Sequence, residues 1–395
     1  MHVGLVTRGD VGYTLDLAGQ LHKAGIAITL YLPYAHTVRE VGTSEQPIER
    51  LYEIGLVPRE CRVRLIRLPR MRDPRSLAVF RRLSQTIRDD GVEVAHLLVG
   101  PDEFWFALLA SLLRDIPVTT TMIEATPVVG QSFPFPVIWA IQKLLAHGSD
   151  VIIVNGTEQV ELVHKLYHLP GDRVIYIPLN VRSTAIQWAA GTVPEEPGTV
   201  LFFGRAVPSK GLMYLVQAQP LVTRQVPHAR ILISAHGSEL ERCRQMIQDG
   251  SRFEIHEGFV PGDVTTAYFQ RASLVAIPYL SSTSSGVLMT AYAFAKPVVA
   301  TSISGLSDYV QDGVTGLLVP PGQPEPLAEA IARLLSNDAL RHRMGENARL
   351  WVEEWQEGIT QKTLRAYEKA ISIHSSSGWQ ASGKARQDNT LLNRI

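Results

Sequence analysis

The chain has little that would tie it to an oxidising compartment, to nucleic acid or to a membrane. Its 395 residues include only 2 cysteines, Cys61 and Cys243, which lie far apart, so a disulfide framework is not expected. The 38 basic and 38 acidic residues cancel, whereas a general nucleic-acid binder carries a basic excess. No apolar run approaches the roughly 18 residues of a membrane span. No basic and apolar leader opens the chain, so we expect a cytoplasmic protein.

The remaining composition is that of a globular protein with more than one core. Apolar residues make up 45% of the chain and aromatic residues 7%, which excludes a disordered chain. A length of 395 residues exceeds what one hydrophobic core usually supports. We therefore expect two domains.

Short runs rich in β-branched residues alternate with helical patterns along the whole chain. Continuous apolar strands separated by helices are typical of parallel sheets that helices cover on both faces. The sequence therefore predicts an α/β protein with two doubly wound, Rossmann-like domains. The expected strands are residues 3–7, 26–32, 62–68, 94–98, 118–122, 151–154 and 174–177 in the first half, and 200–203, 230–234, 253–257, 274–277, 297–300 and 316–319 in the second.

The boundary between the domains is expected where turn-forming residues interrupt the periodic pattern, at residues 181–199. The first domain then covers residues 1–182 and the second residues 199–355. The tail from residue 375 to 395 is polar and rich in serine and glycine, which predicts disorder.

A pair of cations follows the first strand of the second half. Strand 200–203 leads into Gly204 and Arg205, and Lys210 lies one loop further on, just before a helix. Ligands in open parallel sheets bind beyond the carboxyl ends of the strands. Two cations there are suited to neutralise a diphosphate as it becomes a leaving group. The alternative is a solvated turn.

A serine-rich loop, residues 281–285, precedes a helix that opens at Gly286 and is apolar on nearly every face. The first amides of such a helix, at Gly286 and Val287, lie at the positive end of its dipole and are suited to hold a phosphate. The alternative is that the serines only cap the helix, which would still leave these amides available.

These segments together resemble the donor-binding half of glycosyltransferase family 4, whose members are retaining enzymes with the GT-B fold. The resemblance covers residues 199–335, with the motifs in the family's order. It implies that Arg205 and Lys210 are catalytic and stabilise the departing diphosphate of a nucleotide sugar. The donor-binding residues implied are Gly204, Gly237, Phe259 and Val260 (whose backbone would receive the base), Ser282, Ser285, Gly286, Val287 and Thr290.

The sequence departs from the family at two of these positions. The family places two glutamates eight residues apart in this segment, one near the transferred sugar and one on the ribose. Here Ser282 and Thr290 occupy those places. A hydroxyl donates or accepts a hydrogen bond but brings no charge. Thr290 is expected either to keep a weaker ribose contact or to bond its own helix backbone.

The first half is less specific. Gly9 and Gly12 lie between strand 3–7 and a helix, which permits close approach to a ligand, although a plain tight turn fits equally. The family often carries histidines where this chain has Ile123 and Val128. By the resemblance, Glu124 would contact an acceptor hydroxyl. The alternative is a solvated loop acid.

Arginines outnumber acids between residues 59 and 88. A basic face there is suited to anionic lipid headgroups or a lipid-diphosphate acceptor at the inner face of the membrane, and the alternative is a solvated basic face. The arginines concerned are Arg59, Arg62, Arg64, Arg67, Arg70, Arg72, Arg75, Arg81, Arg82 and Arg88.

The resemblance implies two Rossmann-like domains facing across a cleft, with helix 356–374 crossing back to the first domain. We expect a glycosyltransferase, hexosyltransferase-like and retaining, that uses a nucleotide-diphosphate sugar and a glycan, lipid-linked or small-molecule acceptor in polysaccharide or glycoconjugate synthesis. No cofactor or metal is expected, since His236 and His256 are isolated. The alternatives are a non-catalytic relative that binds a nucleotide sugar, and a GT-B sugar-nucleotide epimerase.

Overall fold

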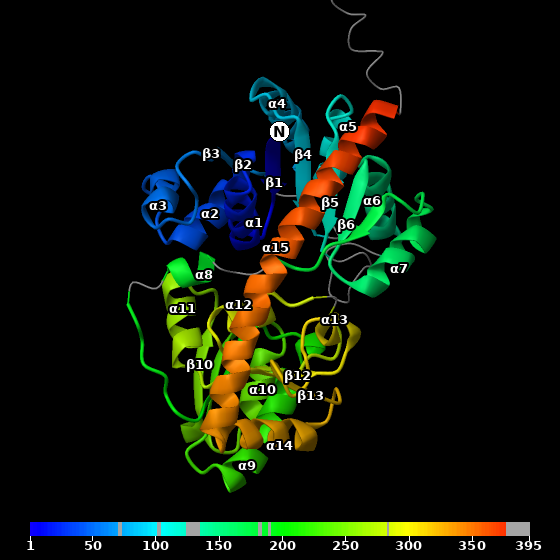
Figure 1. Ribbon diagram of the computed structural model, residues 1–395. Helices are drawn as coiled ribbons and strands as arrows, with labels where there is room; N and C mark the ends of the chain where they lie inside the picture. Colours follow the sequence, from blue (N-terminus) through cyan, green and yellow to red (C-terminus); the bar gives the residue numbers. More distant parts are fainter. Residues whose placement is uncertain are drawn as a thin grey trace, which may run out of the picture.

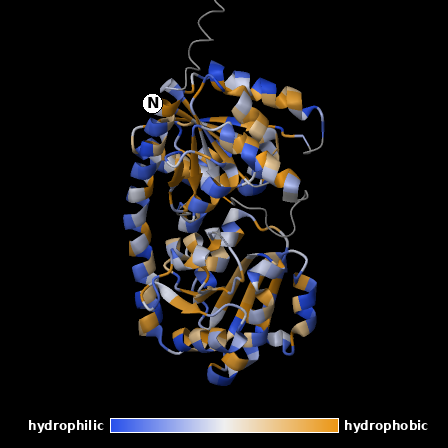
Figure 2. Cartoon of the chain, turned by 90° about the vertical axis from the view of Figure 1, so that its right-hand side faces the viewer, coloured by the Kyte–Doolittle hydropathy of each residue, from blue (hydrophilic) through white to orange (hydrophobic). Residues whose placement is uncertain are grey.

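Two parallel β-sheets, one in each half of the chain, organise the structure (Figure 1). This computed structural model describes residues 1–69, 73–100, 104–123, 135–180, 184–188, 191–282 and 284–376. Helices cover both faces of each sheet, and most strands are coloured as hydrophobic along their length (Figure 2). The predicted α/β architecture with two doubly wound domains is confirmed.

The first sheet has seven strands in the order β3-β2-β1-β4-β5-β6-β7, all parallel. Its strands are β1 (His2–Thr7), β2 (Ala27–Pro33), β3 (Arg62–Ile66), β4 (Val94–Val99), β5 (Val118–Met122), β6 (Val151–Val154) and β7 (Val174–Tyr176). Its helices are α1 (Val11–Lys23), α2 (Tyr34–Val41), α3 (Pro47–Glu53), α4 (Ser76–Asp89), α5 (Phe104–Leu112), α6 (Phe135–His147) and α7 (Thr157–Tyr167).

The second sheet has six parallel strands in the order β10-β9-β8-β11-β12-β13. Its strands are β8 (Thr199–Arg205), β9 (Arg230–His236), β10 (Phe253–Glu257), β11 (Leu274–Ile277), β12 (Val298–Thr301) and β13 (Gly316–Val319). The helices are α8 (Thr184–Gln187) in the connection, then η1 (Pro208–Lys210), α9 (Leu212–Gln225), α10 (Leu240–Met246), η2 (Gly250–Arg252), α11 (Gly262–Arg271), α12 (Gly286–Ala293), α13 (Ser304–Ser307), α14 (Pro324–Leu335) and α15 (Asp338–Ser376).

Alternation along a strand explains why both faces of the first sheet are covered. In β4, Leu97 packs with α4, α5 and α6, whereas its neighbour Leu98 packs with α1 on the other face. Both side chains are buried, because successive residues of a strand point to opposite faces. A strand of this kind is apolar at nearly every position (in β4 all but His96), which is why it is recognisable in the sequence.

Helix α15 joins the two domains along one side of the molecule (Figure 1). Its first part buries Met344 in the core of the second domain, and its last part buries Ala366 and Ala370 against β6. The hydroxyl of Tyr367 lies 2.7 Å from Nδ1 of His96, a buried residue of β4. A domain ending at residue 355 and a separate helix at 356–374 are expected from the sequence. Helix α15 instead runs through that position without a break.

A second tie between the domains is the hydroxyl of Tyr309, which follows α13. It donates a hydrogen bond to the carbonyl of Asn155 at 2.5 Å and accepts one from the amide of Leu179 at 3.0 Å. Tyr309 is fully buried, so these bonds form away from water. The domains therefore meet through specific contacts as well as through α15.

Several strand ends differ by one or two residues from the sequence-based expectation, those of β3 and β8 among them. β3 ends at Ile66 rather than at residue 68, and β8 continues to Arg205 rather than ending at residue 203. β8 is longer because its partner β9 also extends, so that Arg205 pairs with His236 in the ladder. Of the tail expected from residue 375, all but the first two residues lie outside the described part of the chain.

Candidate functional site

The residues singled out in the two halves lie at the carboxyl ends of the central strands of the two sheets. β1 lies between β2 and β4, and β8 lies between β9 and β11, so the chain order reverses at both strands. Such a reversal opens a crevice where ligands of open parallel sheets bind. Gly9 and Gly12 follow β1, and Gly204 and Arg205 end β8. The cleft between the domains is therefore lined from both sides.

Lys210 lies over one buried aromatic ring, that of Tyr279, just after β11. Nζ of Lys210 lies 3.7 Å from the ring centroid and 3.4 Å from Oγ of Ser282. Burial raises the pKa of the Tyr279 phenol, against a hydrogen bond with Ser285 and the positive charge of Arg205. Arg205 itself is exposed. The structure therefore places both positive charges near the loop that precedes α12.

The N-terminal turn of α12, which follows this loop, has the arrangement suited to bind a phosphate. Ser285 is the N-cap of α12, and its Oγ accepts a hydrogen bond from the amide of Leu288 at 3.3 Å. The amides of Gly286 and Val287 belong to the first turn, whose N–H groups have no acceptor within a helix. They lie at the positive end of the helix dipole, beside the two cations.

Ser282 and Thr290, the positions where the resemblance implies two glutamates, both donate their hydroxyl hydrogen bonds to the backbone. Ser282 donates to the carbonyl of Ser284 at 2.7 Å, and Thr290 donates to the carbonyl of Gly286 at 2.9 Å. The helix-backbone alternative for Thr290 is therefore the one the structure has. Its oxygen keeps acceptor capacity only, so Thr290 is left as a weak partner for a hydroxyl group of a ligand.

A pocket of about 210 Å³ opens beside α12 and continues the site away from the cations. Of the residues expected at the donor, Gly204, Phe259, Val260 and Thr290 line it, together with Gly12 of the first domain. The other lining residues were not expected at the donor site from the sequence. They are Glu40, Ala185, Trp188, Phe203, Ser234, His236, Gly258, Gly262 and Thr265.

One lining residue of this pocket has an unusual environment. Ser234, on β9, is 2% exposed, and its Oγ has no hydrogen-bond partner. A buried hydroxyl without a partner is unfavourable by roughly 1–3 kcal/mol, so few persist without a reason. A serine within the apolar run of residues 231–235 was the signal in the sequence that could have drawn attention to it.

First-domain helix α2 reaches the rim of the same pocket. The guanidinium of Arg39 lies 5.2 Å from the ring centroid of Phe259, which is 53% exposed. The next residue, Glu40, lines the pocket. This contact brings a carboxylate from the first domain to a pocket built mainly by the second.

Two glycines named from the sequence have a structural reason for being glycine. A Cβ on Gly237 would lie 2.4 Å from the carbonyl oxygen of Ala206, and its φ is 140°. Gly204 has a φ of 115°, and a Cβ there would lie 3.7 Å from Val287. Both positions let two loops of the site pass close to each other.

Glu124 and Val128 lie outside the described residues. Gly9 is exposed at the cleft, and Asp10 beside it caps α1 by accepting from the amide of Tyr13 at 3.0 Å. Among the residues that the structure describes, no group of three or more His, Cys, Asp and Glu side chains could hold a metal ion.

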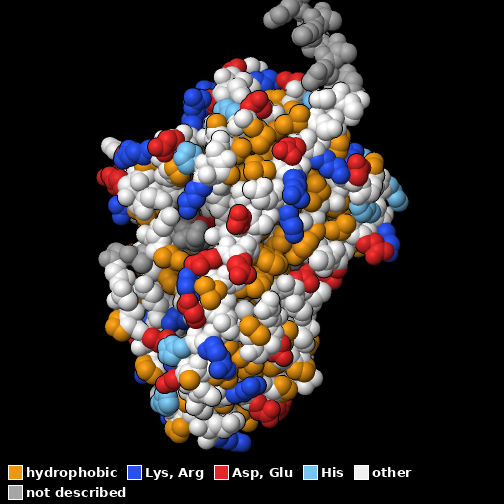
Figure 3. Space-filling view, in the orientation of Figure 1, with side chains coloured by type: hydrophobic (Ala, Val, Ile, Leu, Met, Phe, Trp, Pro, Cys, Tyr) orange, Lys and Arg blue, Asp and Glu red, His pale blue; other side chains and the backbone are white. Residues whose placement is uncertain are grey.

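The arginine-rich stretch is less basic in the fold than in the sequence. Arg62 and Arg64, on the edge strand β3, both pair with Asp90. Arg59 pairs with Glu49 and Arg88 with Asp115. Positive and negative side chains also intermingle on the face shown in Figure 3. Arg81 and Arg82 are exposed, whereas Arg70 and Arg72 lie outside the described residues.

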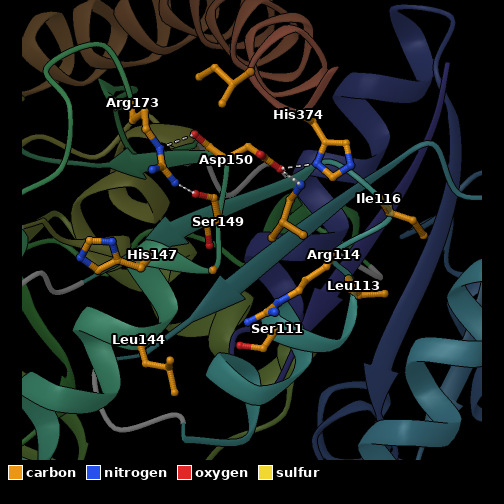
Figure 4. Close-up of a pocket in the computed structure, with 13 residues that line it drawn as sticks. Ser111, Leu113, Arg114, Ile116, Leu144, His147, Ser149, Asp150, Arg173 and His374 are labelled. Atoms are coloured by element: carbon orange, nitrogen blue, oxygen red, sulfur yellow. Dashed lines mark hydrogen bonds and ion pairs between the residues drawn. The ribbon is translucent and has the colours of Figure 1, made fainter. Parts of the chain in front are cut away.

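A second pocket, of about 240 Å³, lies in the first domain at the amino-terminal ends of β5 and β6 (Figure 4). Nδ1 of His374, near the end of α15, is 3.2 Å from Oδ2 of Asp150. The guanidinium of Arg173 donates to the carbonyls of Asp150 and Ser149. Because ligands of such sheets bind at the carboxyl ends of the strands, this cluster is better explained as the anchor of α15.

No helix within the described ranges has the length and apolar character needed to cross a membrane. The apolar helix α6 buries Ile138, Ile141 and Leu145 in the first domain but exposes Val137 and Leu144.

Comparison with known proteins matches both halves of the chain. The profile described as "Glycosyl transferases group 1" matches residues 197–337, and that described as "Glycosyl transferase 4-like domain" matches residues 9–180. A D-inositol 3-phosphate glycosyltransferase of Nocardioides is 26% identical over 408 aligned positions, which cover 92% of this chain and 86% of the relative.

Solved structures agree with the fold. Sucrose-phosphate synthase of Thermosynechococcus elongatus superposes with a TM-score of 0.69 at 19% identity, covering 94% of this chain and 99% of the other. HepE of Anabaena, solved in complex with UDP-glucose, superposes with a TM-score of 0.66 at 15% identity, covering 95% and 100%. At these identities the likeness establishes the two-domain fold alone.

Proposed function

Because this chain belongs to the group 1 glycosyltransferases and has the GT-B fold, we propose that it transfers a hexose from a nucleotide-diphosphate sugar to an acceptor hydroxyl with retention of configuration. Retention is the behaviour that the resemblance to family 4 implies. The acceptor would be a glycan, a lipid-linked glycan or a small polyol.

One observation carries this proposal: Lys210 contacts the loop that leads into α12, and Gly204, the residue before Arg205, lies near Val287 in the first turn of that helix. The charge of Arg205 acts on the Tyr279 phenol, and Lys210 lies over the same ring. Two fixed cations and the first amides of a helix form an environment for a diphosphate that gains charge as it leaves. The adjacent pocket of about 210 Å³ then has the position and size for the nucleoside.

In the proposed reaction, the acceptor oxygen forms a bond to the anomeric carbon while the bond from that carbon to the diphosphate oxygen breaks. The electron pair of the broken bond stays on the diphosphate, where Arg205, Lys210 and the amides of Gly286 and Val287 stabilise it. The acceptor proton passes to a phosphate oxygen of the donor. This route needs no protein base, which fits a chain with Ile123 at a position where the family often has histidine.

The choice of acceptor rests on weaker support. The relative named for D-inositol 3-phosphate supports phosphorylated polyols as acceptors to test. A lipid-linked acceptor at a membrane surface is less well supported, because five arginines of the stretch 59–88 pair with acids within the domain.

The test is a binding and turnover screen with UDP-, GDP- and dTDP-sugars. We expect one nucleotide to raise the melting temperature, and slow hydrolysis or transfer of its sugar. Arg205→Ala should lose most of the turnover, whereas Arg224→Ala, which removes an exposed charge at the end of α9, should not. If no nucleotide stabilises the protein, the assignment of the donor site is wrong.

A non-catalytic relative is the second candidate. It is favoured by the hydroxyls of Ser282 and Thr290, which replace charged side chains and donate to backbone carbonyls. Binding of a nucleotide sugar without hydrolysis or transfer, across a panel of acceptors, would establish this alternative.

A further inference from the structure

The nucleoside pocket contains a carboxylate that no motif of the sequence indicated. Glu40, on α2, lines the pocket with Gly12 from the first domain, whereas most of the other walls belong to the second domain and the connection. The cation–π contact of Arg39 with Phe259, at 5.2 Å, holds this end of α2 at the pocket rim. The packing of the two domains therefore places Glu40 at this pocket.

Glu40 is the one acidic side chain among the described residues that line this pocket. The hydroxyls there belong to Ser234, Thr265 and Thr290, and Thr290 already donates its proton to its own helix. A ribose presents two neighbouring hydroxyls, each of which needs an acceptor when it is buried. A carboxylate has two oxygens and about four acceptor positions, so one group is able to receive both hydroxyls.

We propose that Glu40 binds the ribose hydroxyls of the donor across the cleft, in place of a carboxylate at position 290. The inference rests on the proposed function, since it concerns the nucleotide of the same donor. The same logic is seen in dinucleotide-binding folds, where an acid accepts a hydrogen bond from the ribose.

This arrangement has a consequence for substrate binding. A ribose contact from the first domain and a diphosphate contact from the second exist together only when the domains are close, as they are in this structure. Glu40 thus couples recognition of the nucleotide to closure of the cleft over it. A carboxylate on α12 would bind the ribose without that coupling.

The experiment compares binding of UDP with binding of 2′-deoxy-UDP and 3′-deoxy-UDP, by calorimetry or by the fluorescence of Trp188, which lines the pocket. A hydrogen bond to a charged group is worth about 1.5–3 kcal/mol, so the wild type should bind UDP roughly ten- to a hundredfold more tightly than a deoxy form. Glu40→Gln should reduce this preference to about threefold or less.

Two further variants make the test specific. Glu45→Gln changes an exposed acid just beyond α2 and should keep the full preference for ribose. Glu40→Gln combined with Thr290→Glu should recover part of the preference, because it returns a carboxylate to the opposite wall of the same pocket. Thermal melting of each variant shows that it is folded.

The outcomes separate the two proposals. If the wild type binds none of UDP, GDP and dTDP, the proposed function fails and this inference with it; if it binds only another nucleotide, the deoxy forms of that nucleotide replace those of UDP. If the wild type prefers the ribonucleotide and Glu40→Gln keeps the same preference, the role of Glu40 is wrong while the proposed function stands. A wild type that binds ribo and deoxy forms equally also overturns the inference.

Discussion

Nζ of Lys210 lies 3.7 Å from the centre of the Tyr279 ring, and that ring is buried directly behind the loop that leads into α12. A cation over an aromatic face is attracted by roughly 0.5–2 kcal/mol, more when water is excluded. The ring therefore restrains a long and flexible side chain at the place where a diphosphate would lie.

Lys210→Ala should lower kcat about 10²- to 10³-fold, because removing one fixed donor from a developing anion has an effect of this size. The free energy of unfolding should fall by no more than about 2 kcal/mol, the size of the lost contact with Tyr279. Steady-state donor hydrolysis and a urea titration measure the two quantities. Arg333→Ala, an exposed change on α14, is the control for loss of one positive charge. An unchanged kcat in Lys210→Ala would show that Lys210 takes no part in the reaction.

Tyr279→Phe and Tyr279→Leu should differ in activity. Phenylalanine keeps the aromatic face under Lys210, so its kcat should stay within about threefold of the wild type. Leucine removes the face and should lower kcat by about tenfold or more, through loss of roughly 1–2 kcal/mol of restraint. Equal activities in the two variants, at equal melting temperatures, would show that the ring does not position Lys210.

Ser234→Ala should have opposite effects on stability and on nucleotide binding. Its hydroxyl is buried without a partner, so removing it should leave the ligand-free protein as stable or more stable, by up to about 1 kcal/mol. The same change should weaken nucleotide binding about three- to thirtyfold if the ligand supplies the missing partner.

The control for this prediction is Ser273→Ala, at a second buried serine of the same domain. Oγ of Ser273 accepts from the amide of Gly198 at 3.2 Å and donates to the carbonyl of Glu196 at 3.3 Å. Its removal should destabilise the protein without affecting the nucleotide. Urea unfolding and calorimetry give both quantities, and a destabilised Ser234→Ala with normal affinity would contradict the ligand role.

Asp150→Asn should change how stability depends on pH. Burial raises the pKa of Asp150 above its ordinary value of 3.8, against the hydrogen bond from the amide of Val118 and the charges of His374 and Arg173. The folded state therefore holds this proton more tightly than the unfolded state, so the carboxyl favours folding less as pH rises above 3.8. Asparagine lacks this dependence.

The measurement is the free energy of unfolding of both proteins between pH 4 and pH 7, by urea titration. The wild type should lose stability relative to Asp150→Asn as pH rises through the lower part of this range. His374→Gln, measured in parallel, reports the contribution of the partner on α15. A difference between wild type and Asp150→Asn that is constant with pH would contradict the direction of the pKa shift.

The strands could be predicted from the sequence because they are buried on both faces. In β4 all six residues are buried and all but His96 are apolar, so the run is not confused with a half-exposed segment. The ends of the strands were harder to predict, because a strand stops where its neighbour stops pairing. β8 continues through Arg205 only because β9 continues to His236, and no local signal encodes that agreement.

The candidate site divides in the same way. Arg205, Lys210 and the start of α12 lie close to one another along a strand-loop-helix pattern that the residues themselves specify, and their meeting place follows from parallel-sheet geometry. The pairing of Arg62 and Arg64 with Asp90 was not predictable, because the acid comes from a helix end that only the fold brings to β3.

Local sequence patterns thus indicate the two cations and the helix that begins at Gly286, and the alternation of strands and helices indicates the two-sheet architecture. The environment of Ser234 depends instead on its neighbours in β8 and β10, and the place of Glu40 in the same pocket as Thr290 depends on contact between segments of the two domains. Such contacts arise from burying apolar surface and from docking one domain on the other. Their geometry is a property of the whole packed molecule rather than of any stretch of residues.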